Sequence, residues 1–289
     1  MNLRCLIVVP VLAVVAACAP QERRSEIAVE RDLVYGRGNT TDLRLDLAMP
    51  RTGAGPFPAV IFLHGGGWKA GNRQEMNHFI EGVARLGYVG VTVEYRLAPS
   101  ARFPAQIEDC QMAVRWLRAH AKDYRIQPDR IGVVGFSAGG HLACLLGLTG
   151  GIQAVVSFFG PTDFTTGDWS KDLMNGAIVP FLGGTFADTP EVYRQASPVN
   201  YVTKEAPPFL FFHGTEDKLV PVDQSQRLAE KLKSVGVPVR LVVLKTEGHG
   251  FSDAANQVCM QQMLDFLNER LRRPNPRLIF SNRLISPTK

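Results

Sequence analysis

The chain has 289 residues, of which 45% are hydrophobic and 20% are charged, a composition that excludes a disordered or fibrous protein. The formal charge is +5, but six basic and no acidic residues lie from Arg270 to the end, so the rest is close to neutral. No basic stripe interleaved with aromatic residues runs through this neutral body, so nucleic acid is not an expected partner.

The N-terminus has the pattern of a secretion signal over residues 1–17. Arg4 precedes a 12-residue apolar run from Leu6 to Ala17, which is shorter than the roughly 20 apolar residues of a membrane-spanning helix. Val15-Ala16-Ala17-Cys18 resembles the lipobox of bacterial lipoproteins, in which the chain is cut before the cysteine. The resemblance implies export, a lipid on Cys18 and anchoring in a bacterial membrane on the periplasmic side. The alternative is an ordinary signal peptide cut near Ala17 or Ala19.

Three cysteines remain beyond the signal and Cys18: Cys110, Cys144 and Cys259. An odd number in an oxidising compartment allows at most one internal disulfide. Cys144 falls on an apolar helical segment, which favours a buried free thiol. No pair or cluster has metal-ligand spacing, so we expect no metal site.

Residues 18–27 are expected to form a polar tether, and residues 28–273 a single domain that alternates strands and helices. Strands are predicted at Ile27–Tyr35, Asp42–Ala48, Ala59–Leu63, Tyr88–Glu94, Arg130–Phe136, Gln153–Phe159, Phe209–His213 and Val239–Leu244. Helices are predicted at Asn72–Leu86, Pro104–His120, Ala138–Leu148, Asp223–Ser234 and Ala255–Leu271. The first two strands form a hairpin across Gly36-Arg37-Gly38-Asn39. About eight strands interleaved with helices indicate an α/β fold, a mostly parallel sheet covered on both faces.

Residues 161–206 interrupt this alternation and are rich in Gly, Pro and Thr. The segment is expected over the carboxyl edge of the sheet, where open α/β sheets bind ligands. It either shapes a substrate pocket or is a plain connection, and the sequence leaves both open.

Gly135-Phe136-Ser137-Ala138-Gly139 is a G-x-S-x-G motif between an apolar strand and an Ala/Leu-rich helix. A serine nucleophile needs a sharp turn to expose its hydroxyl, and flanking glycines prevent clashes in that turn. The positive end of the following helix favours developing negative charge. The strand–turn–helix context therefore predicts Ser137 as a nucleophile.

A serine hydroxyl needs a base, and the base needs a carboxylate that holds its tautomer. His249 lies in a glycine-bounded loop after the last strand, and Asp217 follows the strand Phe209–His213. Their order after Ser137 matches the Ser…Asp…His order of α/β-hydrolases. Asp163 is the rival acid and is interpreted mainly as a turn former. The remaining histidines are assigned to hydrogen-bonding support (His64, His213), packing (His141) or the surface (His78, His120).

His64-Gly65-Gly66-Gly67-Trp68 follows the strand Ala59–Leu63. Consecutive glycines let backbone N–H groups approach a reacting carbonyl and stabilise an oxyanion. The expected donors are the amides of Gly66, Gly67 and Ala138. A glycine-rich turn without chemistry is the alternative.

Five segments together closely resemble the α/β-hydrolase esterases: HGGGW, Tyr95-Arg96-Leu97-Ala98-Pro99, GFSAGGH, GTEDKLVP and GHGF. The nearest groups are the hormone-sensitive-lipase-like enzymes and the bifunctional acetyl/feruloyl esterases that act on plant polysaccharides, over about residues 30–272. The resemblance implies the α/β-hydrolase fold and the same roles for Ser137, Asp217 and His249. It departs at Phe136, where many relatives carry an acidic residue. It also departs in lacking a long N-terminal cap, which favours an open site.

These observations predict hydrolysis of short acyl esters through an acyl-enzyme, with acetyl or feruloyl groups on carbohydrate among the substrates. No metal or organic cofactor is implied. A related amide hydrolase, such as a peptidase or arylformamidase, and a catalytically silent binding lipoprotein on the same fold remain alternatives. The sequence does not predict an oligomeric state. The basic tail, residues 274–289, either lies on an anionic membrane or is solvated.

Overall fold

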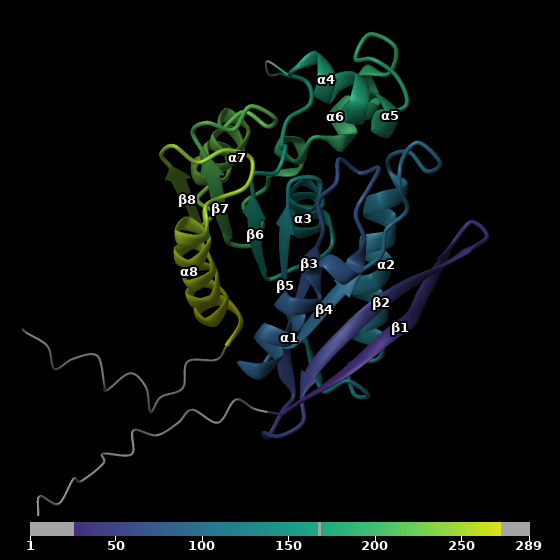
Figure 1. Cartoon of the computed structure of the whole chain (residues 1–289), viewed down its shortest axis with the longest axis vertical. Helices are drawn as coiled ribbons and strands as arrows, with labels where there is room; N and C mark the ends of the chain where they lie inside the picture. Colours follow the sequence, from purple (N-terminus) through teal and green to yellow (C-terminus); the bar gives the residue numbers. More distant parts are fainter. Residues whose placement is uncertain (1–25, 167–168, 273–289) are drawn as a thin grey trace, which may run out of the picture.

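A computed structural model describes residues 26–166 and 169–272. Cys18, the predicted signal over residues 1–17, most of the tether and the tail 274–289 lie outside them. One eight-stranded sheet runs through the centre in the order β1-β2-β4-β3-β5-β6-β7-β8 (Figure 1). The strands are β1 (Ile27–Gly38), β2 (Thr41–Pro50), β3 (Phe57–Leu63), β4 (Val89–Val93), β5 (Ile126–Phe136), β6 (Ala154–Phe158), β7 (Phe209–Gly214) and β8 (Val239–Leu244).

The predicted α/β-hydrolase fold, a mostly parallel sheet with helices on both faces, is confirmed. Only the pairs β1–β2 and β2–β4 are antiparallel, and the pairs from β4 through β3 to β8 are parallel. Strands covered on both faces need apolar side chains in both directions. In β3, Ala59, Ile61 and Leu63 pack into one core, and Val60 and Phe62 pack into the other.

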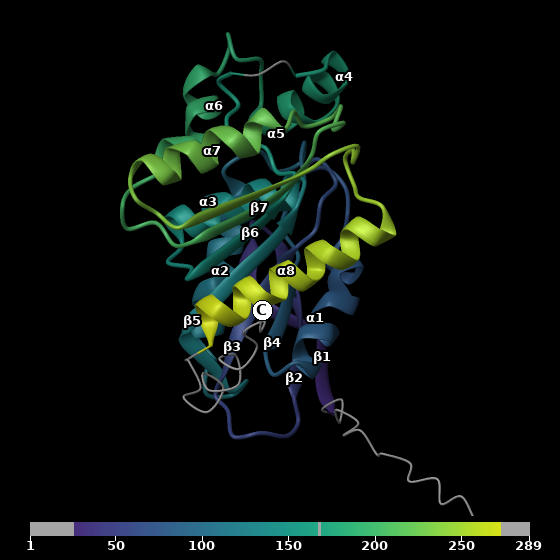
Figure 2. The ribbon, with the colours of Figure 1, turned by 90° about the vertical axis from the view of Figure 1, so that its left-hand side faces the viewer.

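The helices divide between these two cores. The first core is covered by α2 (Ala105–Ala119), α3 (Ala138–Thr149) and α7 (Asp223–Ser234). The second is covered by α1 (Asn77–Arg85) and α8 (Asp253–Leu271); Figure 2 shows α8 crossing that face. Each helix buries one apolar stripe, such as Ile80, Val83 and Ala84 of α1.

The start of the chain differs from the prediction in two places. The hairpin turn is Asn39-Thr40, whereas the predicted turn began at Gly36. Gly36 and Gly38 belong to β1. A Cβ on Gly36 would lie 1.9 Å from Met112 Sδ, and one on Gly38 would lie 2.6 Å from Arg96 Cδ. These glycines make room for neighbouring side chains. The helix predicted over Asn72–Leu86 is also divided, into a 3₁₀ turn η1 (Arg73–Met76) and α1.

The segment over residues 161–206 contains short helical pieces above the carboxyl edge of the sheet (Figure 1). They are α4 (Lys171–Leu173), the π-helical turn η2 (Met174–Ile178), α5 (Val179–Leu182), α6 (Pro190–Ala196) and the 3₁₀ turn η3 (Pro198–Tyr201). The Phe181 ring stacks on Trp68 at 4.3 Å. The segment therefore packs against the glycine-rich loop that follows β3.

Cys110, Cys144 and Cys259 are all buried free thiols. Burial raises the pKa of all three thiols, that of Cys144 to about 12 with the Ser157 hydroxyl opposing the shift. None of the three is therefore a thiolate at neutral pH.

Candidate active site

Ser137 lies at a sharp turn between β5 and α3. Its φ of 54° and ψ of −118° are sparsely populated by residues other than glycine and are typical of strained functional turns. A Cβ on Gly135 would lie 2.0 Å from the Gly139 carbonyl oxygen, and one on Gly139 would lie 2.2 Å from that of Leu63. The two glycines of the motif are therefore a steric requirement of the turn that presents the hydroxyl.

The three predicted triad residues meet at the carboxyl edge of the sheet. The His249 Nε2 atom lies 2.8 Å from Ser137 Oγ, and His249 Nδ1 lies 2.8 Å from Asp217 Oδ2. An ionised carboxylate only accepts hydrogen bonds, so Nδ1 carries the proton and Nε2 is left to accept from the serine hydroxyl. This is the arrangement that a general base requires.

The Asp217 carboxylate is fully enclosed by protein, and its side chain has 0% relative exposure. Burial by itself raises the pKa of this carboxyl, but hydrogen bonds from His213 and His249 outweigh it. The electrostatic interaction with His249 and the hydrogen bond from the Val220 amide act in the same direction, so the pKa of Asp217 lies well below its ordinary value. The other oxygen, Oδ1, accepts from the amides of Leu219 and Val220, each at 2.9 Å. Asp217 therefore remains an anion while it orients the imidazole.

His213 hydrogen-bonds to this carboxylate, the supporting role that the sequence predicted for it. Its Nε2 atom lies 2.9 Å from the Val220 carbonyl oxygen and 3.3 Å from Asp217 Oδ2, so Nε2 carries the proton. Its Nδ1 atom accepts from the Ser225 hydroxyl at 2.7 Å. Ser225 was not predicted, because a serine in an amphipathic helix carries no local signal that it faces a buried histidine.

The predicted oxyanion residues lie on two sides of Ser137. Gly66 and Gly67 have φ values of +106° and +59°, and Gly66 is exposed. A Cβ on Gly66 would lie 2.2 Å from the Ala70 carbonyl oxygen, so no larger residue fits this loop. Ala138 is the first residue of α3, and the first N–H groups of a helix have no partner within it.

His64 and Tyr95 hold this loop from behind. His64 Nδ1 lies 2.7 Å from the Gly65 carbonyl oxygen, and the Tyr95 hydroxyl donates to the His64 carbonyl at 2.8 Å. A trans peptide directs its N–H opposite to its C=O, so anchoring the Gly65 carbonyl fixes the direction of the Gly66 N–H. Burial lowers the pKa of His64, which keeps this imidazole neutral.

Asp163, His141 and His78 lie as predicted, whereas His120, predicted at the surface, packs against Trp116. The Asp163 carboxylate accepts from the Thr165 amide at 3.0 Å and from the Thr166 hydroxyl at 2.9 Å, as a turn former does. His141 is buried, accepts from Trp68 Nε1 at 3.1 Å and donates to the Ala196 carbonyl at 2.7 Å. His78 is exposed, and His120 is half-buried against Trp116.

Within residues 26–166 and 169–272, no group of three or more His, Cys, Asp or Glu side chains is arranged to hold a metal ion. The same part of the chain has no helix long and apolar enough to span a bilayer.

A family model described as BD-FAE matches residues 45–232, which include Ser137 and Asp217. The chain belongs to the BD-FAE family. It is 34% identical over 240 residues to the probable carboxylic ester hydrolase LipM of Mycobacterium tuberculosis. That match covers 75% of this chain and 54% of LipM, so the chain spans about half the length of this relative.

Two solved structures are similar to this BD-FAE chain over most of its length. The bifunctional GH43-CE protein of Bacteroides eggerthii has a TM-score of 0.73 and 26% identity, covering 83% of this chain and 38% of that protein. The thermophilic esterase Est2 of Thermogutta terrifontis has a TM-score of 0.70 and 25% identity, covering 86% of this chain and 94% of Est2.

The nucleophile motif of this BD-FAE chain has an aromatic residue where many relatives of the resembled group carry an acidic one. The Phe136 ring stacks between Phe79, at 5.2 Å, and Phe158, at 4.7 Å. Phe136 is therefore a packing residue, and its ring stiffens the end of β5 beside Ser137.

The triad reaches solvent on one side only. Ser137 is half-buried, and the His249 side chain is 18% exposed while its partner Asp217 is enclosed. The Ser137 and His249 side of the triad is therefore accessible from solvent, and the Asp217 side is not.

Proposed function

We propose that the protein is a serine carboxylesterase that hydrolyses short acyl esters through a Ser137–His249–Asp217 triad. The observation that carries this proposal is the unbroken hydrogen-bond chain from the Ser137 hydroxyl through His249 to an enclosed anionic carboxylate. The strained serine turn and the similarity to named esterases support it.

In this mechanism Ser137 Oγ attacks the ester carbonyl carbon while His249 Nε2 takes the hydroxyl proton. The carbonyl oxygen becomes an oxyanion, which accepts hydrogen bonds from the amides of Gly66, Gly67 and Ala138. His249 returns the proton to the leaving alcohol, and an acyl-enzyme on Ser137 remains. Water, deprotonated by His249, then releases the acid and restores the serine.

Acetyl or feruloyl groups on carbohydrate are the substrates we propose within this class. An open triad suits an ester that hangs from a large alcohol, and the similar Bacteroides eggerthii protein is described as a bifunctional GH43-CE. A screen of acyl-chain lengths, with acetylated and feruloylated sugars beside p-nitrophenyl esters, separates these possibilities.

Two measurements test the proposed chemistry. A fluorophosphonate probe is expected to label wild-type protein and to leave Ser137→Ala unlabelled, with turnover of p-nitrophenyl acetate lost in the same variant. Folded wild-type protein that neither reacts with the probe nor cleaves the ester would contradict the proposal. Faster turnover of an anilide or formamide than of the matched ester would favour an amide hydrolase.

We also propose that the protein is an exported lipoprotein anchored through Cys18. The motif Val15–Cys18 supports this, and β1 starts at the end of the sheet opposite the triad, because Ile27 pairs with Pro50 at the far end of β2. A tether from that end directs the site away from the membrane. Metabolic labelling with a fatty acid should mark the wild type and not Cys18→Ala; equal labelling of both would refute the anchor.

A further inference from the structure

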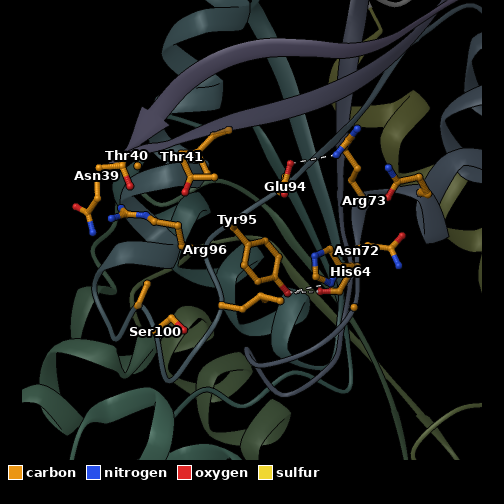
Figure 3. Close-up of a pocket in the computed structure, with 16 residues that line it drawn as sticks. Asn39, Thr40, Thr41, His64, Asn72, Arg73, Glu94, Tyr95, Arg96 and Ser100 are labelled. Atoms are coloured by element: carbon orange, nitrogen blue, oxygen red, sulfur yellow. Dashed lines mark hydrogen bonds and ion pairs between the residues drawn. The ribbon is translucent and has the colours of Figure 1, made fainter.

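A pocket separate from the triad opens at the carboxyl ends of β3 and β4 (Figure 3). It has a volume of about 580 Å³, within the range of small-ligand pockets. Three segments far apart in the sequence line it. They are the β1–β2 turn around Asn39–Thr41, the loop Gly71–Gln74, and the loop after β4 from Glu94 to Ala101.

The charged groups of this pocket are already neutralised. Arg73 binds Asp46 at 3.0 Å and Glu94 at 3.1 Å, and it also contacts Asp32. Arg96 binds Asp109 at 2.7 Å, and that carboxylate is buried. An anionic ligand would have to displace buried carboxylates from both guanidinium groups, so the pocket is not built for an anion.

The free hydrogen-bonding groups of the pocket are uncharged. Asn39, Thr40, Thr41, Gln74 and Ser100 are exposed, and none of these side chains hydrogen-bonds to another group in the described part of the chain. In Figure 3, labelled Asn39, Thr40, Thr41 and Ser100 lie on one side of the hollow. Exposed hydroxyl and amide groups from the β1–β2 turn and from the loop after β4 suit a neutral ligand that bears many hydroxyl groups.

The floor of the pocket adjoins the loop that carries the proposed oxyanion donors. His64 and Gly71 line the pocket, and His64 Nδ1 contacts the Gly65 carbonyl oxygen at 2.7 Å. On its other side, a Cβ on Gly65 would lie 3.4 Å from Ser137 Cβ. Gly65 therefore separates the pocket-lining His64 from the nucleophile, and the exposed Gly66 lies next to Gly65.

We propose that this pocket is a subsite for a sugar residue of a carbohydrate ester whose esterified residue sits at Ser137. The proposal rests on the esterase function proposed above and extends it to named residues. A saccharide that crosses the glycine loop places a neighbouring sugar ring between the β1–β2 turn and the loop after β4. A small ester such as p-nitrophenyl acetate does not reach the pocket.

The test compares p-nitrophenyl acetate with acetylated xylo- and manno-oligosaccharides of one to six residues. For wild-type protein, kcat/KM is expected to rise with oligosaccharide length. For Asn39→Ala/Ser100→Ala, the ratio of kcat/KM on the longer oligosaccharides to that on p-nitrophenyl acetate should fall about tenfold, the loss of two neutral hydrogen bonds. Ser100→Trp, which fills the pocket, should remove the length dependence.

Thr203→Trp is the matched control, because Thr203 is exposed and does not line the pocket. Its ratio of kcat/KM on the longer oligosaccharides to kcat/KM on p-nitrophenyl acetate should equal that of the wild type. Thermal melting checks that each variant is folded. If the folded wild-type protein does not hydrolyse p-nitrophenyl acetate, the proposed esterase function itself is refuted. The subsite alone is refuted if p-nitrophenyl acetate is cleaved but kcat/KM does not rise with the length of either oligosaccharide. It is also refuted if that rise persists in both pocket variants.

Discussion

At the scale of single residues, the site depends on one carboxylate held as an anion in an enclosed position. Asp217 receives two backbone amides and two imidazoles, which is enough to overcome the cost of its burial. Asp163 has no such role, because its oxygens are taken by Thr165 and Thr166. The two aspartates therefore make a matched pair for mutation.

Asp217→Asn is expected to lower kcat on p-nitrophenyl acetate by about 10³–10⁴-fold with little change in KM, because an amide no longer holds the His249 tautomer. Asp163→Asn should keep kcat within about threefold of wild type, since a turn and not a proton relay is altered. Steady-state kinetics on both variants decides. A larger loss of kcat in Asp163→Asn than in Asp217→Asn would mean that Asp163, and not Asp217, orients His249.

At the scale of the elements, backbone conformation in the loop after β3 decides whether an oxyanion can be bound. Gly66 has a φ of +106°, and a side chain there meets the Ala70 carbonyl. Gly82 in α1 is exposed, and a Cβ there would meet nothing within 4 Å. The same substitution at these two glycines therefore has opposite expected effects.

Gly66→Ala should lower kcat by about a hundredfold or more, because a displaced loop loses at least one oxyanion donor. Gly82→Ala should keep kcat and raise the free energy of unfolding by about 0.5–1 kcal/mol, because alanine is the better helix former. Ester kinetics and urea unfolding measure the two effects. Wild-type kcat in Gly66→Ala would remove that loop from the mechanism.

His141 joins three elements: it lies on α3, accepts from Trp68 of the glycine loop and donates to Ala196 at the end of α6. Burial lowers its pKa to about 4, and the bond to the Ala196 carbonyl opposes that shift only in part. The folded state therefore requires a neutral imidazole, whereas the unfolded state takes up a proton near pH 6.5.

Between pH 6.5 and 4 the unfolded state binds the extra proton, so His141 should reduce the free energy of unfolding as the pH falls, by up to about 3 kcal/mol. His141→Gln removes this titration. Its stability deficit relative to wild type at pH 7 should therefore narrow as the pH falls towards 4. Urea unfolding at several pH values tests this, and a deficit that stays constant with pH would contradict it.

At the scale of the whole molecule, an ion-pair network around the buried Arg73 attaches the N-terminal hairpin to the sheet. Arg73, 7% exposed, contacts Asp46 of β2, Asp32 of β1 and Glu94 at the end of β4. Asp46 is 1% exposed, and without Arg73 it would keep only the half-exposed Arg31, at 3.4 Å, as a charged partner. The network also forms one wall of the pocket beside the glycine loop.

Arg73→Met is expected to lower the free energy of unfolding by about 1.5–3 kcal/mol, because it removes the closest charged hydrogen-bond donor of the buried Asp46 carboxylate. Arg37→Met is the control, since Arg37 pairs with Asp42 on the surface and is 70% exposed; its effect should stay within about 1 kcal/mol. Equal effects in urea unfolding would mean that the network contributes no more than a surface pair.

The sequence by itself determined the alternation of strands and helices, the turn at Ser137 and the identity of its partners. Such features depend on local steric and hydrophobic patterns and on the order of residues along the chain. The turn at Asn39-Thr40 was missed because the reason for Gly36 and Gly38 lies in Met112 and Arg96, which are distant in the sequence.

Only the tertiary structure decided the contacts between such distant segments. Three such features arise where separate strands end at one edge of the sheet. They are the contact of His213 with Ser225, the anchoring of the glycine loop by His64 and Tyr95, and the pocket beside that loop. Hydrogen-bond geometry and burial depend on packing across the fold, and no local pattern in the chain encodes them.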